Sequence, residues 1–277
     1  ESTNYINGPI VSQFSSSLES YLNVNHVIPC ANGTDALQIS LMALSLEPGD
    51  EVICPSFTYV ATAEVISLLR LRPVMVDVDP QTFNLTAEII RPHITDKTKA
   101  IVPVHLFGQS CDMEDIMLLA EEYGLYVIED NAQAIGSEYT FSDGTVKKTG
   151  TIGNIGTTSF FPSKNLGCYG DGGAIFTNDL KLAKKLKMIS NHGQEKKYYH
   201  KITGCNSRLD SIQAAILEVK LNYLDHYTSK RNEMANKYDD SFSNIPELSI
   251  PSRQSNSTHV FHQYTLKVLP ELRSDLI

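Results

Sequence analysis

The chain has few cysteines and no long apolar run. Only five of its 277 residues are cysteines, an odd number without close pairing, which argues against a disulfide framework or a C-x-x-C metal site. No apolar stretch reaches the roughly 20 residues that cross a bilayer, and no signal-peptide pattern opens the chain. We therefore expect reduced thiols and a cytoplasmic protein. The cysteines are Cys30, Cys54, Cys111, Cys168 and Cys205.

Basic residues are also scarce. Lysine and arginine number 23 against 32 acidic residues, which gives a formal charge of −9. An acidic surface repels nucleic-acid backbones and anionic membranes, so neither is expected as the main partner. The net charge does not exclude an anionic small molecule, because a local site can be positive inside an acidic protein. No metal site is expected, because His259 and His262 lack the carboxylate or cysteine set that would complete a ligand group.

Apolar β-branched runs alternate with helical patterns through most of the chain. The runs are nearly continuous, as strands buried on both faces require. This alternation predicts an α/β fold with a mostly parallel central sheet sandwiched by helices, whose ligands lie at the carboxyl ends of the strands. The predicted strands are residues 51–54, 73–79, 100–105, 125–129, 158–161 and 173–177, and the predicted helices are 34–44, 113–123 and 180–190.

The pattern changes after Asn206. Residues 207–242 read as one long helix with a mostly apolar stripe, and residues 246–257 are rich in proline and serine, as linkers are. Residues 261–268 read as the first strand of another domain. We therefore predict a large cofactor-binding domain over residues 1–245 and the start of an incomplete small α+β domain over residues 246–277.

Three segments bear chemistry. Asp130 ends an apolar strand, where a carboxylate can meet a cation of a ligand or cap the next helix. Lys164 follows a strand among apolar residues, a setting in which an amine loses its proton easily and attacks a carbonyl; an ordinary surface lysine is the alternative. Gly33 and Thr34 begin a predicted helix, whose free N–H groups can bind a phosphate. The alternative is that this segment is a plain helix cap. A phosphate site, an acid for a pyridinium nitrogen and an amine for an aldehyde are together what pyridoxal 5'-phosphate requires.

The sequence resembles the DegT/DnrJ type of nucleotide-sugar aminotransferases, which have the aspartate-aminotransferase-like fold. The resemblance runs in the family's order across residues 7–268. The matching segments are 32–37 (NGTDAL), 49–53 (GDEVI), 55–62 (PSFTYVAT), 103–109 (PVHLFGQ), 129–133 (EDNAQ), 159–165 (SFFPSKN), 170–173 (GDGG) and 206–215 (NSRLDSIQAA).

The resemblance implies roles for individual residues. Lys164 matches the lysine that forms a Schiff base with pyridoxal 5'-phosphate and moves protons, and Asp130 matches the acid that keeps the pyridine nitrogen protonated. Tyr59 matches the aromatic residue stacked on the ring, and Gln133 matches a residue beside it. The phosphate binders are matched by Gly33, Thr34 and Ser159, with Asn206 and Arg208 supplied by a second subunit, which implies a homodimer.

The resemblance also implies the reaction, in which an amino-acid donor, glutamate by expectation, aminates a nucleotide-linked keto sugar for polysaccharide or another glycosylated product. The segment 191–210 looks most like members that aminate C3, with 4-keto-sugar enzymes as the alternative. Possible sugar or nucleotide contacts are His192, Tyr198, His200 and His262, with Gln263 beside the last; each is otherwise a surface or structural residue.

Three other functions compete with this interpretation. A dehydratase on the same scaffold replaces the lysine, commonly by histidine, and Lys164 argues against it. A non-catalytic regulator on the same fold has no need for Asp130, Lys164 and the phosphate residues together. A Rossmann dehydrogenase is not favoured, because no G-x-G-x-x-G follows the first strand.

Overall fold

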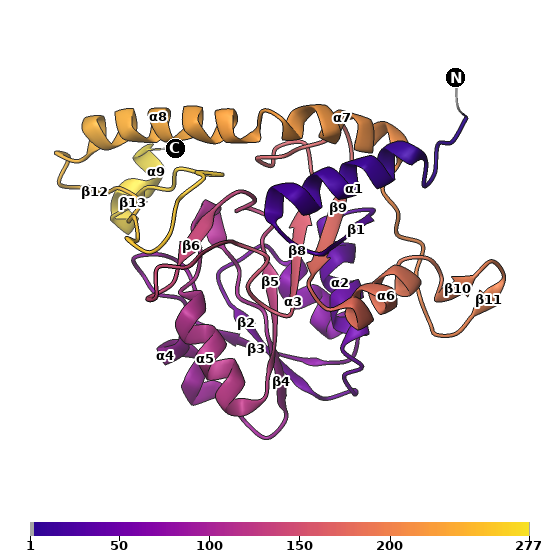
Figure 1. The fold of residues 1–277 in the computed structure, drawn as a ribbon. Helices are drawn as coiled ribbons and strands as arrows, with labels where there is room; N and C mark the ends of the chain where they lie inside the picture. Colours follow the sequence, from indigo (N-terminus) through magenta and orange to yellow (C-terminus); the bar gives the residue numbers. More distant parts are fainter. Residues whose placement is uncertain (1–2, 277) are drawn as a thin grey trace.

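The computed structural model describes residues 3–276 and contains a seven-stranded central sheet (Figure 1). The strand order is β1-β9-β8-β5-β4-β2-β3; the five strands from β8 to β3 are parallel, and β9 is antiparallel to both of its neighbours. The mostly parallel sheet that the sequence predicts is therefore confirmed. Its strands are β1 (His26–Cys30), β2 (Glu51–Pro55), β3 (Arg72–Val76), β4 (Thr98–Ile101), β5 (Tyr126–Asp130), β8 (Ile155–Ser159) and β9 (Gly173–Thr177).

Helices cover both faces of this sheet. Side chains alternate along each strand, so Val52 and Ile128 join the core under one set of helices, whereas Ile53 and Val127 join the core on the opposite face. The first face carries α2 (Gly33–Ala43), α3 (Ala61–Leu68) and α6 (Leu180–Ile189). The other face carries α1 (Pro9–Leu22) and α7 (Ser211–Leu221) near β1 and β9, and α4 (Ala87–Ile90) and α5 (Met113–Tyr123) near β2, β4 and β5.

The predicted single helix over residues 207–242 is wrong. The segment begins extended, because the Ser207 hydroxyl accepts a hydrogen bond from the N–H of Ala31 rather than starting a helical turn. Two helices follow, α7 and α8 (Leu224–Phe242), and they are separated at Tyr223, whose φ of −111° and ψ of 1° interrupt the helical path. Figure 1 shows the two helices nearly in line across one edge of the molecule.

Several predicted strands also differ from the structure, and those predicted at 73–79 and 100–105 end three and four residues earlier, as β3 and β4. The strand predicted at 158–161 lies earlier, as β8, because antiparallel pairing with β9 ends at Ser159. Of the strand predicted at 261–268, only β13 (Lys267–Val268) forms, paired with β12 (Leu248–Ser249). Phe261 has a φ of +44°, which no extended strand adopts.

Smaller elements surround this framework. They are the hairpin of β6 (Glu138–Thr140) and β7 (Val146–Lys148), the hairpin of β10 (Gln194–Lys196) and β11 (Tyr199–His200), and the short helix α9 (Arg273–Leu276). Residues 257–260 contact earlier parts of the chain through bridges from Ser257 to Tyr139 and from His259 to Gln109. Within residues 3–276, no helix is both long and apolar enough to cross a membrane.

Candidate active site

Asp130 is the last residue of β5, at the carboxyl edge of the parallel strands. Its Oδ2 accepts a hydrogen bond from the Thr62 hydroxyl (3.0 Å) and its Oδ1 accepts one from the N–H of Ala132 (3.2 Å). Burial raises the pKa of the carboxyl group, and these two hydrogen bonds and the charge of Lys164 oppose that rise. No α-helix follows Asp130 directly, so it does not serve as the helix cap that the sequence left open.

Lys164 lies in the loop that joins β8 to β9. Burial lowers the pKa of its amine, and the charge of Asp130 partly counters this effect. The two side chains thus influence each other electrostatically, although they lie 34 positions apart in the sequence. A half-buried lysine with a lowered pKa carries more of the neutral amine that attacks carbonyl carbon than a surface lysine does.

Gly33 and Ser159 form one wall of the site. A Cβ atom on residue 33 would lie 2.7 Å from the Cβ of Ser159, too close for any side chain other than hydrogen. Gly33 is the first residue of α2, and the Asn32 side chain caps that helix by accepting the N–H of Asp35 (2.8 Å). The first-turn amides of Gly33 and Thr34 have no carbonyl one turn earlier within the helix, so they can bind an anion beside the Ser159 hydroxyl.

Gln133 and Tyr59 lie in two other loops, each three positions along the chain from a residue of the Thr62–Asp130 hydrogen bond. The Oε1 of Gln133 accepts the N–H of Phe107 (2.8 Å), which fixes the side chain and leaves its NH₂ group as the donor end. Tyr59 is 70% exposed just before α3, so its ring is open to stacking. The helix that follows Tyr59, α3, carries Thr62, the donor to Asp130.

Asn206 and Arg208 flank Ser207. The Ser207 hydroxyl accepts a hydrogen bond from the N–H of Ala31, which directly precedes the helix cap Asn32. Asn206 is exposed and pairs with Asn191, whereas Arg208 is partly buried. The sequence-predicted phosphate residues of the 206–208 segment therefore lie on a strand-like stretch held against the start of α2.

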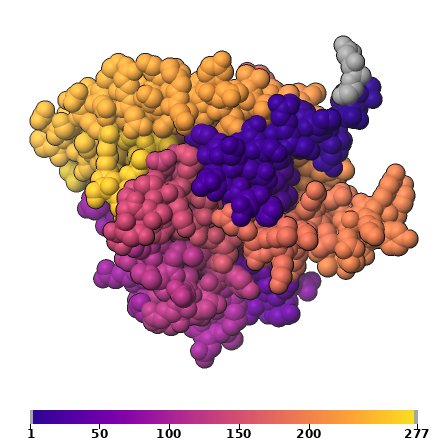
Figure 2. Space-filling view, in the orientation of Figure 1, coloured from indigo at the N-terminus to yellow at the C-terminus, as the bar shows by residue number. Residues whose placement is uncertain are grey.

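His192, Tyr198 and His200 lie together in a different part of the chain. The β10–β11 hairpin that carries the last two projects from the body of the molecule (Figure 2). The Nδ1 of His200 bonds the carbonyl oxygen of His192 (2.8 Å), and Tyr198 is 80% exposed. The structure thus groups these three residues with one another rather than with Asp130 and Lys164.

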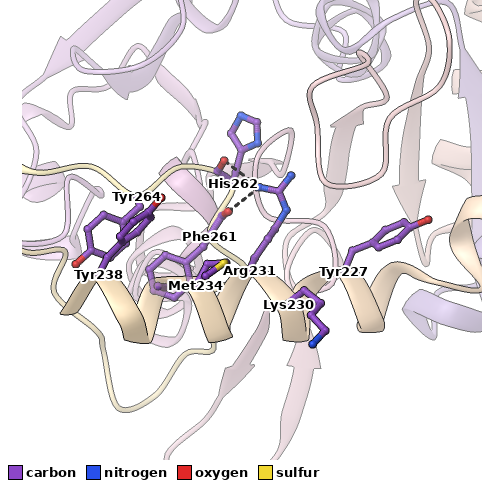
Figure 3. A pocket seen from close by; sticks show the side chains of 9 residues that line it. Tyr227, Lys230, Arg231, Met234, Tyr238, Phe261, His262 and Tyr264 are labelled. Carbon is purple, nitrogen blue, oxygen red and sulfur yellow. Dashed lines mark hydrogen bonds between the residues drawn. The ribbon is translucent and has the colours of Figure 1, made fainter. Parts of the chain in front are cut away.

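His262 lies on the C-terminal segment that crosses α8. The Arg231 side chain donates hydrogen bonds to the carbonyl oxygens of Phe261 (3.0 Å) and His262 (3.4 Å), as Figure 3 shows. Burial lowers the pKa of the His262 imidazole to about 4, and the charges of Lys164 and Arg231 add to this. A neutral imidazole therefore faces Lys164. A cavity of about 530 Å³ beside it is lined by Tyr227, Lys230, Arg231, Met234, Ala235, Tyr238, Phe261, His262 and Tyr264.

Two residues of the site were missed at the level of sequence. Thr62 lies inside the motif at 55–62, but nothing local reveals that its hydroxyl bonds a carboxylate 68 positions away. Asn165 follows Lys164 and donates to the carbonyl oxygen of Val260 (2.9 Å), which joins the lysine loop to the C-terminal segment. Only the tertiary structure brings these partners together.

The residues present fit pyridoxal 5'-phosphate. Ser159 lies so close to Gly33 that its hydroxyl stands beside the first turn of α2, whose free N–H groups suit a phosphate. An amine of lowered pKa and a buried carboxylate influence each other at the same site. The N–H and hydroxyl donors suit the cofactor's phosphate, the amine suits its aldehyde, and the carboxylate suits its ring nitrogen.

Comparisons with known proteins agree with this geometry. The profile of the DegT/DnrJ/EryC1/StrS aminotransferase family matches residues 1–277. The chain is 47% identical to the UDP-2-acetamido-2-deoxy-3-oxo-D-glucuronate aminotransferase of Pseudomonas aeruginosa, over 95% of this chain and 72% of that protein. The crystal structure of S. venezuelae DesV in complex with a ketimine intermediate superposes with a TM-score of 0.94 at 38% identity, covering 99% of this chain and 73% of DesV. The structure of NtdA from Bacillus subtilis with bound cofactor PMP superposes with a TM-score of 0.89 at 38% identity, covering 98% and 61% of the two chains.

Proposed function

Since the chain belongs to the DegT/DnrJ/EryC1/StrS aminotransferase family, we propose that it transfers the amino group of an amino acid to a nucleotide-linked 3-keto sugar. The enzyme is a pyridoxal-phosphate-dependent aminotransferase that acts on keto sugars in biosynthesis. The observation that carries the assignment of its site is the electrostatic pairing of Lys164 with Asp130 beside the wall of Gly33 and Ser159.

Each residue has its own part in this proposal. Lys164 would hold the cofactor through Nζ and would carry protons during the reaction. The Asp130 carboxylate would accept a hydrogen bond from the protonated ring nitrogen, and the Thr62 hydroxyl favours the ionised carboxylate and orients it. Gly33, Thr34 and Ser159 would bind the phosphate, Tyr59 would stack on the ring, and Gln133 would lie beside it. The bound cofactor would supply the electron sink that these residues lack.

The acceptor is proposed to be a 3-keto sugar because the Pseudomonas relative is named for a 3-oxo substrate. The resemblance of the segment 191–210 to C3-aminating members supports the same position. A 4-keto sugar is the second candidate, since enzymes for both positions have similar cores. The amino donor is proposed to be glutamate, and a cytoplasmic location suits the free thiols of all five cysteines.

A homodimer with shared sites is part of the proposal. The β10–β11 hairpin exposes Tyr198 and Tyr199 at 80% and 71%, a large apolar surface for so small an element. A second copy of the chain would cover these rings. His192, Tyr198 and His200 would then contact the sugar or nucleotide bound in the site of that second copy. Asn206 and Arg208 would reach the phosphate of the neighbouring site in the same way.

The direct test is an assay with ¹⁵N-labelled glutamate and a matched pair of nucleotide-linked sugars that carry the ketone at C3 or C4. We expect the label in a 3-amino sugar and little product from the 4-keto compound. Efficient amination at C4 would move the assignment to the second candidate. Labelled product from neither sugar, with the cofactor bound, would exclude both acceptors.

A further inference from the structure

A second buried carboxylate lies directly before Asp130. Glu129 is fully buried, and four donors surround its two oxygen atoms. Oε1 accepts the N–H groups of Ile152 (2.7 Å) and Gly153 (2.6 Å). Oε2 accepts the N–H of Gly150 (2.7 Å) and bonds Nε2 of His105 (2.9 Å). Both oxygen atoms therefore act as hydrogen-bond acceptors, and the four donors fix the carboxyl group in place.

The protonation of His105 follows from its other ring nitrogen. Nδ1 accepts a hydrogen bond from the backbone N–H of Cys111 (3.1 Å), so it carries no proton. Nε2 therefore carries a proton and donates it to Glu129. The Sγ of Cys111 donates to the carbonyl oxygen of Val104 (3.2 Å), which holds Cys111 beside the ring.

The same pair fixes the backbone around Asp130. The N–H of His105 donates to the carbonyl oxygen of Asp130 (3.1 Å), and the N–H of Asp130 donates to that of Pro103 (2.9 Å). Glu129 meanwhile ties β5 to the turn at 150–153 that precedes β8. Side chain and main chain together hold the position from which Asp130 faces Lys164.

We propose that Glu129 and His105 are positioning residues, which hold the end of β5 so that Asp130 keeps the place from which it stabilises the proton on the cofactor's ring nitrogen. The inference rests on the proposed function. It goes beyond it because neither side chain touches the cofactor in that scheme. The charged or titratable groups that face this region are Asp130, Lys164, His105 and Cys111, with His262 beyond Lys164.

The test is the pH titration of the visible absorbance that Lys164 gives when the cofactor is bound to it. Glu129→Gln turns an NH₂ group toward donors that meet an acceptor in the wild-type protein, so the end of β5 shifts and Asp130 stabilises the protonated chromophore less well. The chromophore pKa should therefore fall by on the order of one unit. The exposed Glu122→Gln is the matched control, and it should leave the chromophore pKa unchanged because water screens its charge.

His105 supplies a second pair of variants in case Glu129→Gln fails to fold. His105→Gln retains a donor for Glu129 and should keep the wild-type chromophore pKa, whereas His105→Leu removes the donor and should lower it. A role in packing alone would affect thermal stability in both variants and the chromophore pKa in neither. An unchanged pKa in folded Glu129→Gln, or in His105→Leu, overturns the inference. A wild-type protein without any chromophore would instead contradict the proposed function.

Discussion

Gly33 and Ser159 face each other so closely that a Cβ on residue 33 would lie 2.7 Å from the Cβ of Ser159. Gly33→Ala should therefore move the start of α2 or the Ser159 side chain and weaken cofactor binding by about tenfold or more, or 1.4 kcal/mol. The measurement is the Kd of the cofactor by absorbance or fluorescence titration of the apoenzyme.

A compensating change makes this prediction specific. Ser159→Gly removes the opposing Cβ together with the hydroxyl group, so adding Gly33→Ala to it should weaken cofactor binding far less than Gly33→Ala does in the wild-type protein. If Gly33→Ala weakens binding equally in the Ser159→Gly background, the close approach is not the cause of the loss.

Thr62 should matter through its hydroxyl group. Thr62→Val keeps the shape but removes the donor to Asp130, which raises the pKa of that carboxyl group further. A hydrogen bond to a charged group is worth about 1.5–3 kcal/mol, so kcat should fall by about tenfold or more. Thr62→Ser retains the donor and should retain most of the activity; equal losses in the two variants would point to packing instead.

The lowered pKa of Lys164 predicts how apoenzyme recombines with pyridoxal 5'-phosphate as the pH changes. Only the neutral amine reacts with an aldehyde, and burial favours that form. The recombination rate should therefore rise with pH through a midpoint below 10.5, the ordinary value for lysine. Stopped-flow absorbance at constant ionic strength gives the midpoint, and a value at or above 10.5 would contradict the effect of burial.

Shared active sites predict complementation between two inactive proteins. If Arg208 serves the neighbouring site, a mixed dimer of Lys164→Ala and Arg208→Ala chains contains one site with both residues intact. Random mixing of equal amounts makes half of the dimers mixed, so about a quarter of the wild-type activity should return. If each site uses only its own chain, the mixture stays as inactive as its parts.

Much of the framework could be predicted from local patterns. β9 and α5 have the predicted bounds, because an apolar run and a helical period ending at Gly124 are both local signals. The break at Tyr223 and the left-handed Phe261 carry no such signal, since neighbouring segments impose them.

The candidate site divides in the same way. Asp130 ends a strand, Lys164 lies in the loop after a strand, and Gly33 begins a helix. At such positions the sequence already indicates chemistry. Thr62, Asn165 and the His105–Glu129 pair acquire their partners only through tertiary contacts 24 to 95 positions apart in the sequence.

The most direct test of the central claim is chemical fixation of the cofactor. Borohydride reduction of the holoenzyme, followed by digestion and peptide mass spectrometry, identifies the side chain that holds it. The account predicts a single modified residue, Lys164, loss of the visible absorbance on reduction, and no modification in Lys164→Ala. A tag on another lysine, or unmodified Lys164 in protein that binds the cofactor, would contradict it.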